Sequence, residues 1–311
     1  MTPGRGPAPD EGSDGGPDEA RDRARDRALD RALDRALDRG PSAAGRRDEL
    51  RRGLERLDER VGAACAAAGR DPAGVRVVVT TKTWPASDVV HLAALGVRDV
   101  GEAREQEARA KRSEVAAAGW ADDVEDPGVE DPGVEDPGEG DLGPEDRGTG
   151  RPAPGLRWHF LGRLQRNKAA AVAGWAALVH SCDGDRLADA LARGAERAGR
   201  VLPVLVQVDL QDGVDPRRGG VPPADVRALA DRVAAHPALR LDGLMAVAPQ
   251  GPDPARPFAR LAALAQDLRG DHPGASVLSA GMSGDLEQAV AAGATHLRVG
   301  RAVLGERPPL R

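Results

Sequence analysis

The chain has 311 residues, a formal net charge of −6 at pH 7, two cysteines and no tyrosine. Cys65 and Cys182 are too few for a disulfide framework and lack metal-ligand spacing, so we expect a reduced, cytoplasmic protein without a metal site. No apolar run approaches the roughly 20 residues that a membrane span needs, so no membrane partner is expected. The acidic, Gly/Pro-rich start lacks the apolar core of a signal peptide.

Two segments of low complexity are expected to lie outside the folded core. An Arg-Ala-Leu-Asp unit repeats over 21–39, and a Val-Glu-Asp-Pro-Gly unit repeats over 124–138. The first predicts a transient charged helix, and Pro and Gly in every unit of the second favour disorder. We therefore predict a disordered N-terminal extension over 1–45. A domain over 46–311 follows, and a disordered acidic insertion at 121–155 interrupts it.

The charge is unevenly distributed along the chain. Residues 121–155 contain 12 acidic and 2 basic side chains, and residues 1–45 contain 10 acidic and 8 basic ones, which leaves +6 on the rest. A mildly basic folded part suits a small anionic ligand. No stripe of basic residues is interleaved with aromatic residues, so we expect no nucleic-acid partner.

Strands and helices are predicted to alternate along the remaining sequence. The helices are expected at 46–68, 86–95, 103–118, from 166 onward, and at 184–199, 223–235, 256–269 and 285–292. The strands are expected at 75–81, 97–100, 157–161, 177–182, 203–208, 240–247, 276–280 and 296–299. This alternation indicates an α/β fold, a single closed (β/α)8 TIM barrel with an additional N-terminal helix. A doubly wound open sheet is the alternative.

The first predicted strand ends at a lysine. Val and Thr favour a buried strand up to Thr81, and Pro85 prevents the strand from continuing beyond Lys82. Binding sites of α/β proteins lie at the carboxyl ends of the strands. A partly desolvated amine at that position can attack a carbonyl carbon. A lysine that simply points into water is the alternative.

The loops after the last two strands have the composition of an anion site. Gly281, Met282 and Ser283 follow the seventh strand, and Gly300 and Arg301 follow the eighth. Small residues leave backbone N–H groups accessible, and barrels often bind phosphate between these two loops. A Gly/Ser turn that caps a helix explains either loop alone. Together with Lys82, the two loops favour a phosphorylated aldehyde, with pyridoxal 5'-phosphate (PLP) as the leading candidate.

Several motifs resemble those of one family. Trp158 to Lys168 (WHFLGRLQRNK) is similar to its long WHF…NK signature, and Thr81-Lys82-Thr83 resembles its lysine motif. Matching segments also occur at 101–107, 243–246, 281–287 and 298–300, in the family's order. The chain thus resembles the pyridoxal phosphate homeostasis proteins, the YggS/PROSC-like family related to the barrel domain of alanine racemase.

The resemblance implies a role for each matched residue. Lys82 is expected to form a covalent aldimine with PLP, and Ser283, with the backbone around Gly300 and Arg301, to hold the phosphate. Arg298 is expected to face the pyridine nitrogen, by analogy with the racemase. Its guanidinium cannot accept a proton, so it would keep that nitrogen unprotonated. The residues expected to line or support the pocket are Met245, Gly281 and Met282.

Four positions depart from the family pattern. Ala103 replaces an Asn near the lysine, and Arg301 replaces a common Thr at the phosphate site. Arg218 stands where Lys is usual, and Gly284 replaces a frequent polar residue. Backbone N–H groups are unaffected by these changes, so PLP binding is expected to persist.

Other polar residues are expected to have structural roles. His159 is expected to be a hydrogen-bonded structural histidine, and Cys182 a small buried hydrophobe. Glu102 is expected in a loop, solvated or paired with Lys82, with an acid/base role as the alternative. Arg166 and Lys168 are expected to begin a solvated helix. Asp209 either orders the pocket or forms a turn, so no catalytic residue is assigned.

The resemblance implies a monomeric carrier that buffers PLP or delivers it to apo-enzymes. A PLP-dependent amino-acid racemase is the alternative. The related racemases take a tyrosine from a second domain as one of their two bases, and this sequence has no tyrosine. An adaptor with a vestigial cofactor site is a third, weaker alternative.

Overall fold

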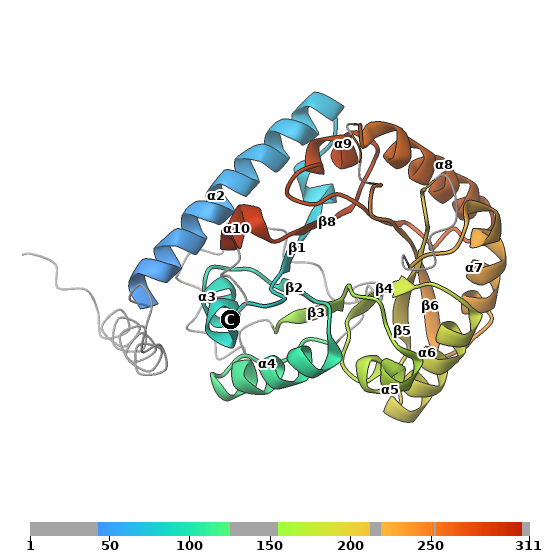
Figure 1. Cartoon of the computed structure of the whole chain (residues 1–311), viewed down its shortest axis with the longest axis horizontal. Helices are drawn as coiled ribbons and strands as arrows, with labels where there is room; N and C mark the ends of the chain where they lie inside the picture. Colours follow the sequence, from blue (N-terminus) through green and yellow to red (C-terminus); the bar gives the residue numbers. More distant parts are fainter. Residues whose placement is uncertain (1–42, 125–154, 212–218, 250, 252, 307–311) are drawn as a thin grey trace, which may run out of the picture. The chain divides into compact units, whose positions relative to one another are not determined.

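The computed structural model describes residues 43–124, 155–211, 219–249, 251 and 253–306. Eight parallel strands form a closed barrel in chain order, and β8 pairs with β1 (Figure 1). The strands are β1 (Arg76–Thr80), β2 (Asp99–Glu102), β3 (Arg157–Phe160), β4 (Leu178–Cys182), β5 (Leu202–Gln207), β6 (Leu239–Met245), β7 (Val277–Ser279) and β8 (His296–Val299). The predicted (β/α)8 barrel is confirmed, and the open-sheet alternative is wrong.

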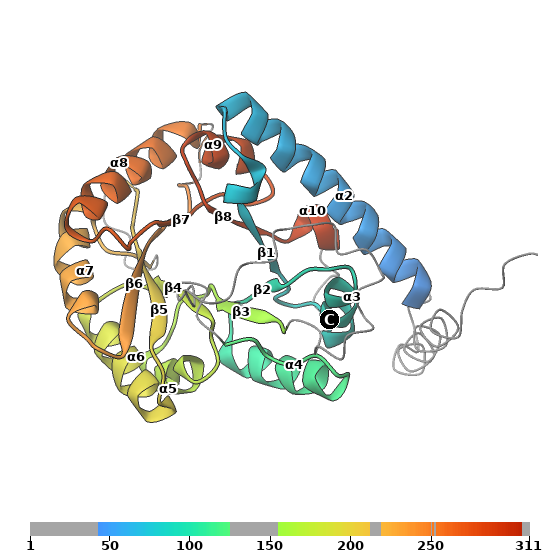
Figure 2. The same ribbon diagram turned by 180° about the vertical axis from the view of Figure 1, so that it is seen from behind.

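Helices surround the strands, as both views of the ribbon show (Figures 1 and 2). They are α2 (Ala43–Ala68), α3 (Ala86–Ala94), α4 (Glu105–Ala117), α5 (Arg166–Ala173), α6 (Asp185–Ala198), α7 (Val226–Ala234), α8 (Ala255–Asp271), α9 (Leu286–Ala291) and α10 (Arg301–Leu304). Two short 3-10 helices, η1 (Pro72–Gly74) and η3 (Pro223–Asp225), precede β1 and α7. Apolar side chains of the strands and of the inward helix faces make up the buried core.

One strand lies two residues further along the chain than predicted. β2 covers Asp99–Glu102 rather than 97–100, and all four of its residues are buried. The predicted end of the strand at residue 100 placed Glu102 in a loop, and a carboxylate is rarely buried. Burial is possible here because a lysine from α4 reaches this carboxylate, as described below.

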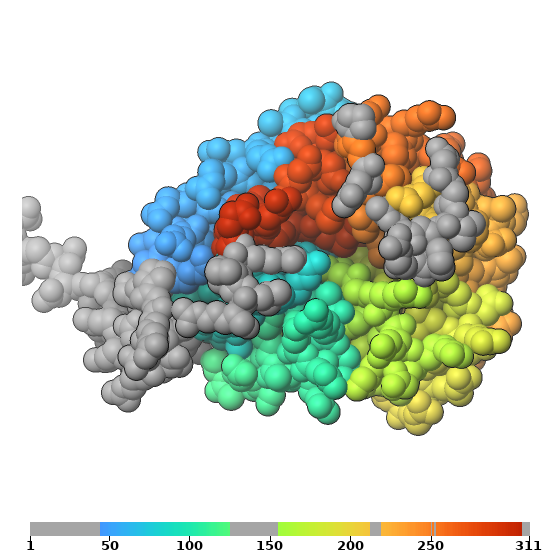
Figure 3. All heavy atoms as spheres, in the orientation of Figure 1, coloured from blue at the N-terminus to red at the C-terminus, as the bar shows by residue number. Residues whose placement is uncertain are grey.

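The N-terminal helix α2 packs closely on the end of the chain. A Cβ on Gly53 would lie 2.5 Å from the Val303 carbonyl oxygen, so only glycine permits this approach of α2 to α10. The space-filling view shows α2 (blue) directly beside the last part of the barrel (red) (Figure 3). The predicted N-terminal helix is therefore an integral part of the barrel's outer layer.

The residues that flank the acidic repeat are paired with each other. The Asp123 N–H donates to the Leu156 carbonyl over 2.8 Å, and the Leu156 N–H donates to the Ala121 carbonyl over 2.9 Å. Residues 121–124 and 155 therefore belong to the ordered structure, although the insertion was predicted to include them. Residues 125–154 and the Arg-Ala-Leu-Asp repeat lie outside the described residues. Within the described part, no helix has the length and apolar character of a membrane span.

Candidate functional site

Lys82 lies in a turn that is held firmly at its first residue. This anchor turn, residues 81–84, begins directly after β1, and the Trp84 N–H donates to the Thr81 carbonyl over 3.0 Å. Thr81 is fully buried, whereas Lys82 is partly exposed. Thr83 has φ 71°, the left-handed region that a β-branched residue avoids. Such strain persists where the surroundings over-determine the backbone, and it is frequent at binding sites.

A buried ion pair between Lys111 and Glu102 holds the first residue of the anchor turn in place. Lys111 of α4 donates to the Thr81 carbonyl over 2.8 Å and to Glu102 Oε1 over 2.5 Å. The Thr81 hydroxyl donates to the same carboxylate oxygen over 2.7 Å. Glu102 is therefore neither a loop residue nor solvated, and its recorded partners are Thr81 and Lys111. These contacts hold the backbone next to Lys82.

The sequence contains only three lysines, Lys82, Lys111 and Lys168. Lys111 has 8% of its side chain exposed and is committed to Glu102. Lys168, which begins α5 with Arg166 as expected, lies 3.7 Å from Glu105 Oε2. The many arginines cannot replace a lysine here, because a guanidinium stays protonated and is no nucleophile. Among these three, Lys82 is the one at the end of β1, where a ligand site is expected.

The loops after β7 and β8 are joined to each other and lie beside the anchor turn. The Ala302 N–H donates to Ser283 Oγ over 3.2 Å, which links the β7 loop (residues 280–285) to the β8 loop (residues 300–302). A Cβ on Gly300 would lie 3.3 Å from the Thr80 carbonyl oxygen, so the β8 loop runs closely past the end of β1. The structure thus brings Lys82, Ser283 and Gly300 together at one rim.

The N-terminal helix holds the β7 loop from outside. Both terminal nitrogens of Arg60 donate to the Ser283 carbonyl over 3.2 Å, and Arg60 also pairs with Glu287 at 2.7 Å. Within the loop, the Met282 N–H donates to Asp285 Oδ1 over 2.5 Å. Gly281 has φ +88°, and a Cβ there would meet Ala289 at 2.5 Å. The loop conformation is therefore set before any ligand arrives.

Arg298 is buried inside the barrel and makes two hydrogen bonds to its neighbours. It donates to Ser279 Oγ over 2.6 Å and to the Ala246 carbonyl over 2.8 Å. Burial lowers the pKa of Arg298 to about 10, which still leaves it charged at neutral pH. Its guanidinium is thus fixed between the ends of β6 and β7.

The remaining predicted site residues differ in exposure. Met245 is 2% exposed and packs against Leu178 and Leu205, so it belongs to the core that supports the rim. Met282 is 39% exposed, and the Arg301 side chain is exposed as well. Two other departures from the family pattern also lie in loops at the carboxyl ends of strands, Ala103 after β2 and Gly284 in the β7 loop. The fourth, Arg218, lies outside the described residues.

The other polar candidates have structural partners. His159 is buried and hydrogen-bonded on both ring nitrogens, as expected for a structural histidine. Cys182 is buried, and desolvation raises the pKa of its thiol to about 12, which makes it unreactive. The Gln211 N–H donates to Asp209 Oδ1, a turn contact, so the turn explanation of Asp209 holds.

Sequence reasoning missed Lys111, Ser279 and His180. His180 stands in an apolar strand, Leu178–Cys182, and a polar residue in such a strand is a signal for a buried contact. Lys111 had no comparable signal, because it lies on a helix rich in charged residues.

Two cavities of about 390 Å³ adjoin the barrel. One lies at the carboxyl rim, beside the loops after β2 and β3, and Arg163 and Lys168 contribute to its wall. The other lies at the amino ends of the strands, among Arg76, Asp99, Arg157 and Asp242. Active sites of barrels lie at the carboxyl rim, so the second cavity is remote from Lys82.

The residues at the rim suit PLP. Thr80 Oγ1 is buried without a hydrogen-bond partner next to Gly300, so the rim retains unused polar capacity. The two linked loops offer small residues and a hydroxyl to a phosphate, and an amine lies within one turn of the same strand end. The site therefore fits a phosphorylated aldehyde on chemical grounds.

Comparisons with known proteins agree with this geometry. The family model of the alanine racemase N-terminal domain matches residues 54–308. The pyridoxal phosphate homeostasis protein of Mycobacterium tuberculosis H37Rv is 40% identical over 271 residues, 84% of this chain and 94% of that protein. The protein of the same name from Escherichia coli K12 is 31% identical over 265 residues, 84% of this chain and 97% of that protein.

Solved structures show the same relationship. PipY of Synechococcus elongatus PCC7942, in a structure with PLP bound, is 30% identical with a TM-score of 0.62. The match covers 82% of this chain and all of PipY. Alanine racemase of Corynebacterium glutamicum, at 14% identity and a TM-score of 0.53, shares the fold over 85% of this chain and 63% of the racemase. By sequence, motif order and fold, the chain belongs to the pyridoxal phosphate homeostasis protein family.

Proposed function

We propose that this protein binds PLP covalently through Lys82 and serves intracellular PLP homeostasis as a non-catalytic carrier. The observation that carries the proposal is the position of Lys82. It lies in a turn that is fixed at Thr81, beside two linked loops whose small residues suit the binding of a phosphate. PLP supplies an aldehyde that condenses reversibly with a neutral primary amine, with a C=N bond forming and water leaving. Relatives that are named for PLP homeostasis, and PipY with PLP bound, support this function.

Different residues of the rim hold different parts of the cofactor. Ser283 and the backbone of residues 300–302 bind the phosphate, with Arg60 keeping the β7 loop in place. Lys82 provides the covalent attachment, and the buried Lys111–Glu102 pair keeps its backbone rigid. Arg298 faces the pyridine nitrogen and prevents its protonation, since a guanidinium only donates.

The carrier function is favoured over racemisation by the residues available. Racemisation requires a base on each face of the substrate carbon, and the sequence contains no tyrosine for the second face. Glu102, the carboxylate to which the Thr81 hydroxyl of the anchor turn donates, is fully buried and paired with Lys111. Apo-enzymes that need PLP are the expected recipients, and a reduced cytoplasmic setting suits both partners.

The test is chemical labelling of three lysines. The purified protein is incubated with PLP, reduced with borohydride and analysed by peptide mass spectrometry, and the pyridoxyl mass is expected on Lys82. Lys82→Arg keeps the positive charge but has no nucleophilic amine, so it is expected to abolish the label. Lys168→Arg is the matched control at the same rim and should be labelled like the wild type. Label on Lys111 or Lys168 instead of Lys82 would refute the anchor.

The carrier and the racemase are separated by turnover. The PLP-loaded protein is incubated with alanine or serine enantiomers, and the racemisation rate is compared with that of free PLP. The carrier function predicts rates close to the free-PLP control, together with transfer of PLP to an apo-enzyme. Racemisation far above that control, and dependent on Lys82, would favour an enzyme.

A further inference from the structure

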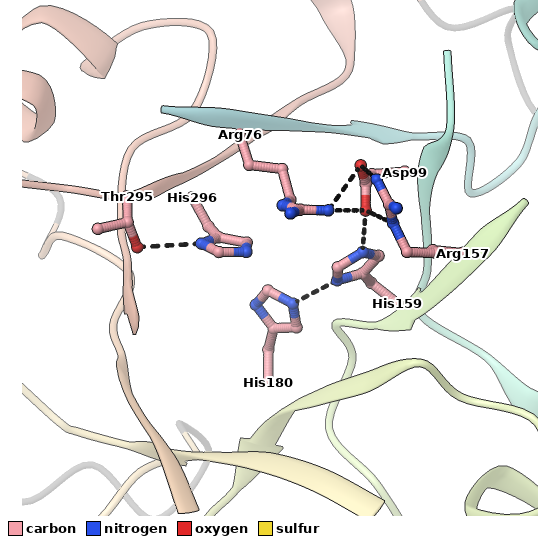
Figure 4. A network of polar contacts seen from close by, with 7 residues as sticks. All are labelled: Arg76, Asp99, Arg157, His159, His180, Thr295 and His296. Carbon is pink, nitrogen blue, oxygen red and sulfur yellow. Dashed lines mark hydrogen bonds and ion pairs between the residues drawn. The ribbon is translucent and has the colours of Figure 1, made fainter. Parts of the chain in front are cut away.

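A continuous chain of buried polar side chains crosses the barrel interior from one end to the other. It starts at Asp99, the first residue of β2, and continues through His159 of β3 and His180 of β4. It ends at Ser279 and Arg298, on β7 and β8 (Figure 4 shows its first three members). We call these five residues the interior chain, and each is at most 6% exposed.

Every link of the interior chain is a hydrogen bond between side chains. His159 Nε2 lies 2.8 Å from Asp99 Oδ1, and His159 Nδ1 lies 2.9 Å from His180 Nε2. His180 Nδ1 lies 2.8 Å from Ser279 Oγ, which also accepts from Arg298 at 2.6 Å. Buried polar groups are normally paired, but a single file of four links between the two ends of a barrel is more than pairing requires.

The carboxylate of Asp99, at one end of the interior chain, determines which atom donates in the first hydrogen bond. Burial alone would raise the pKa of Asp99, but hydrogen bonds from Arg157 and His159 outweigh this and hold the pKa well below its usual value. Asp99 is therefore a carboxylate and only accepts, so His159 donates from Nε2. Arg76 and Arg157 also pair with Asp99, at 3.3 Å and 2.7 Å, and help to keep it ionised.

The remaining donors follow from the Ser279 hydroxyl and from the neutral state of His180. Desolvation lowers the pKa of His180 well below its usual value. Ser279 Oγ accepts from Arg298, and among the described residues His180 Nδ1 is the acceptor within reach of the Ser279 hydroxyl proton. A neutral His180 that accepts at Nδ1 donates from Nε2 to His159 Nδ1, and His159 then donates from Nε2 to Asp99.

We propose that Asp99, His159, His180 and Ser279 are positioning residues that fix Arg298 at the pyridine ring of bound PLP. The inference rests on the proposed function, because Arg298 must face that ring. It assigns an effect on the cofactor to Asp99, which lies at the opposite end of the barrel and touches no cofactor. The contrasting explanation is that the interior chain only stabilises the fold.

The first experiment measures the proton positions without PLP. ¹⁵N–¹H correlation spectra of the histidine side chains in the PLP-free wild type distinguish the two tautomers, and His180→Gln identifies the His180 signals. The proposal predicts a neutral His180 with its proton on Nε2, and a change in its tautomer or signal positions in Asp99→Asn. A proton on His180 Nδ1, or signals that are unchanged in Asp99→Asn, would overturn the proposed direction.

The second experiment uses variants matched for burial and charge. Asp99→Asn and Asp242→Asn each remove a carboxylate that is paired with arginine at the amino-end cavity, but in the described structure only Asp99 contacts a histidine of the interior chain. Ser279→Ala removes the link to Arg298, whereas Ser279→Thr keeps the hydroxyl. Ser181→Ala makes the same change at a fully buried serine whose Oγ has no partner.

The readouts are the absorbance band of bound PLP and its Kd, for folded protein only. The proposal predicts a shifted band and a roughly threefold to tenfold higher Kd for Ser279→Ala, with recovery in Ser279→Thr. Asp99→Asn should shift the band in the same direction, while Asp242→Asn and Ser181→Ala should match the wild type.

The two proposals fail in different ways. If Lys82 of the wild type takes no label, the proposed function fails. If Lys82 is labelled but the Ser279→Ala and Asp99→Asn bands equal those of their controls, the interior chain is structural only, and the positioning inference is refuted. Equal shifts in Asp99→Asn and Asp242→Asn would also refute it, because the effect would then follow from cavity charge alone.

Discussion

The two ends of the barrel use polar groups in opposite ways. At the amino end, charges are paired within the protein, Asp99 with Arg76 and Arg157, and Asp242 with Arg240. At the carboxyl end, the β7 and β8 loops consist largely of small residues and offer backbone N–H groups and the Ser283 hydroxyl. Under the proposed function, the carboxyl end gains further contacts from PLP, whereas these charges at the amino end are paired within the protein.

Because of this difference, substitutions at the two ends are expected to change different properties, stability at the amino end and ligand binding at the carboxyl end. A substitution at the amino end is expected to change the free energy of unfolding, because it leaves buried charges without partners. A substitution in the β7 or β8 loop is expected to change ligand affinity, because the polar groups of these loops are accessible and make few contacts within the protein. The Lys111–Glu102 pair is the exception that tests this rule, since it is a buried ion pair located at the carboxyl end.

The largest effect is expected for Lys111→Met. It leaves the fully buried Glu102 carboxylate without its cation, so the free energy of unfolding should fall by about 3–5 kcal/mol, measured by urea denaturation. Arg109→Met is the matched control on α4, because Arg109 is 74% exposed and lies 3.8 Å from its partner Glu105. It should cost less than about 0.5 kcal/mol. Equal losses in the two variants would contradict the structural role of Lys111.

A pH dependence of stability is expected from the histidines near the amino end. Desolvation lowers the pKa of His296 to about 3, and the nearby charges of Arg76 and Arg157 lower it further while Asp99 opposes them. The unfolded chain protonates this histidine below about pH 6.5, whereas the folded protein does not. The unfolded state then binds more protons, so the free energy of unfolding should fall as pH decreases from about 6.5 towards 3.

The slope of the free energy of unfolding against pH shows which histidines cause the pH dependence. Each neutral buried histidine contributes up to about 1.4 kcal/mol per pH unit in this window, and His180, whose pKa is lowered in the same way, adds to His296. Urea denaturation at several pH values measures the slope. His296→Gln should reduce it, and a slope that does not change in this variant would contradict the assignment.

A smaller effect is expected for Ser283→Ala. The variant removes the hydroxyl that joins the β7 and β8 loops, so the Kd for PLP should rise about tenfold, measured by titration of the PLP absorbance. The free energy of unfolding should change by less than about 0.5 kcal/mol. Ser276→Ala, in the wall of the amino-end cavity, is the control and should leave the Kd unchanged. A large loss of stability with unchanged affinity would reverse the comparison of the two ends.

The smallest effect is expected for deletion of residues 125–154. The two flanks of this segment are hydrogen-bonded to each other, and a Cβ on Gly155 would lie 2.8 Å from the Asp123 Cβ, so a short Gly/Ser link can close the gap. The Kd for PLP and the free energy of unfolding should match those of the full chain, and calorimetry and PLP titration measure both. A failure to fold would show that the segment is more than an appendage.

The order of strands and helices could be predicted from the sequence because each element carries its own signal. Val77 to Val79 followed by Pro85 marks the end of β1, and glycine or proline separates most of the later elements. Lys82 and Ser283 were found for the same reason, since each follows directly from a strand end. Local patterns were sufficient wherever a function depends on neighbours in sequence.

The interior of the barrel could not be predicted in the same way. The pairing of Glu102 with Lys111 decides that β2 extends to Glu102, yet nothing local to either residue indicates the contact. The interior chain joins β2, β3, β4, β7 and β8, and its contacts depend on the register in which the barrel closes. Such partners are set by tertiary geometry, so sequence reasoning reached His159 as a structural residue and Arg298 as a site residue but missed Asp99, His180 and Ser279.

The closure of β8 on β1 has a consequence for the time at which the site appears. Lys82 and Ser283 are separated by about 200 residues, and they become neighbours only when the last strand pairs with the first. Such non-local contacts form late and slowly during folding. Under the proposed function, a nascent chain that lacks β7 and β8 carries the anchor lysine but not the loops proposed to hold the phosphate. Tight retention of PLP would then be a property of the finished molecule, and it would report that synthesis and folding are complete.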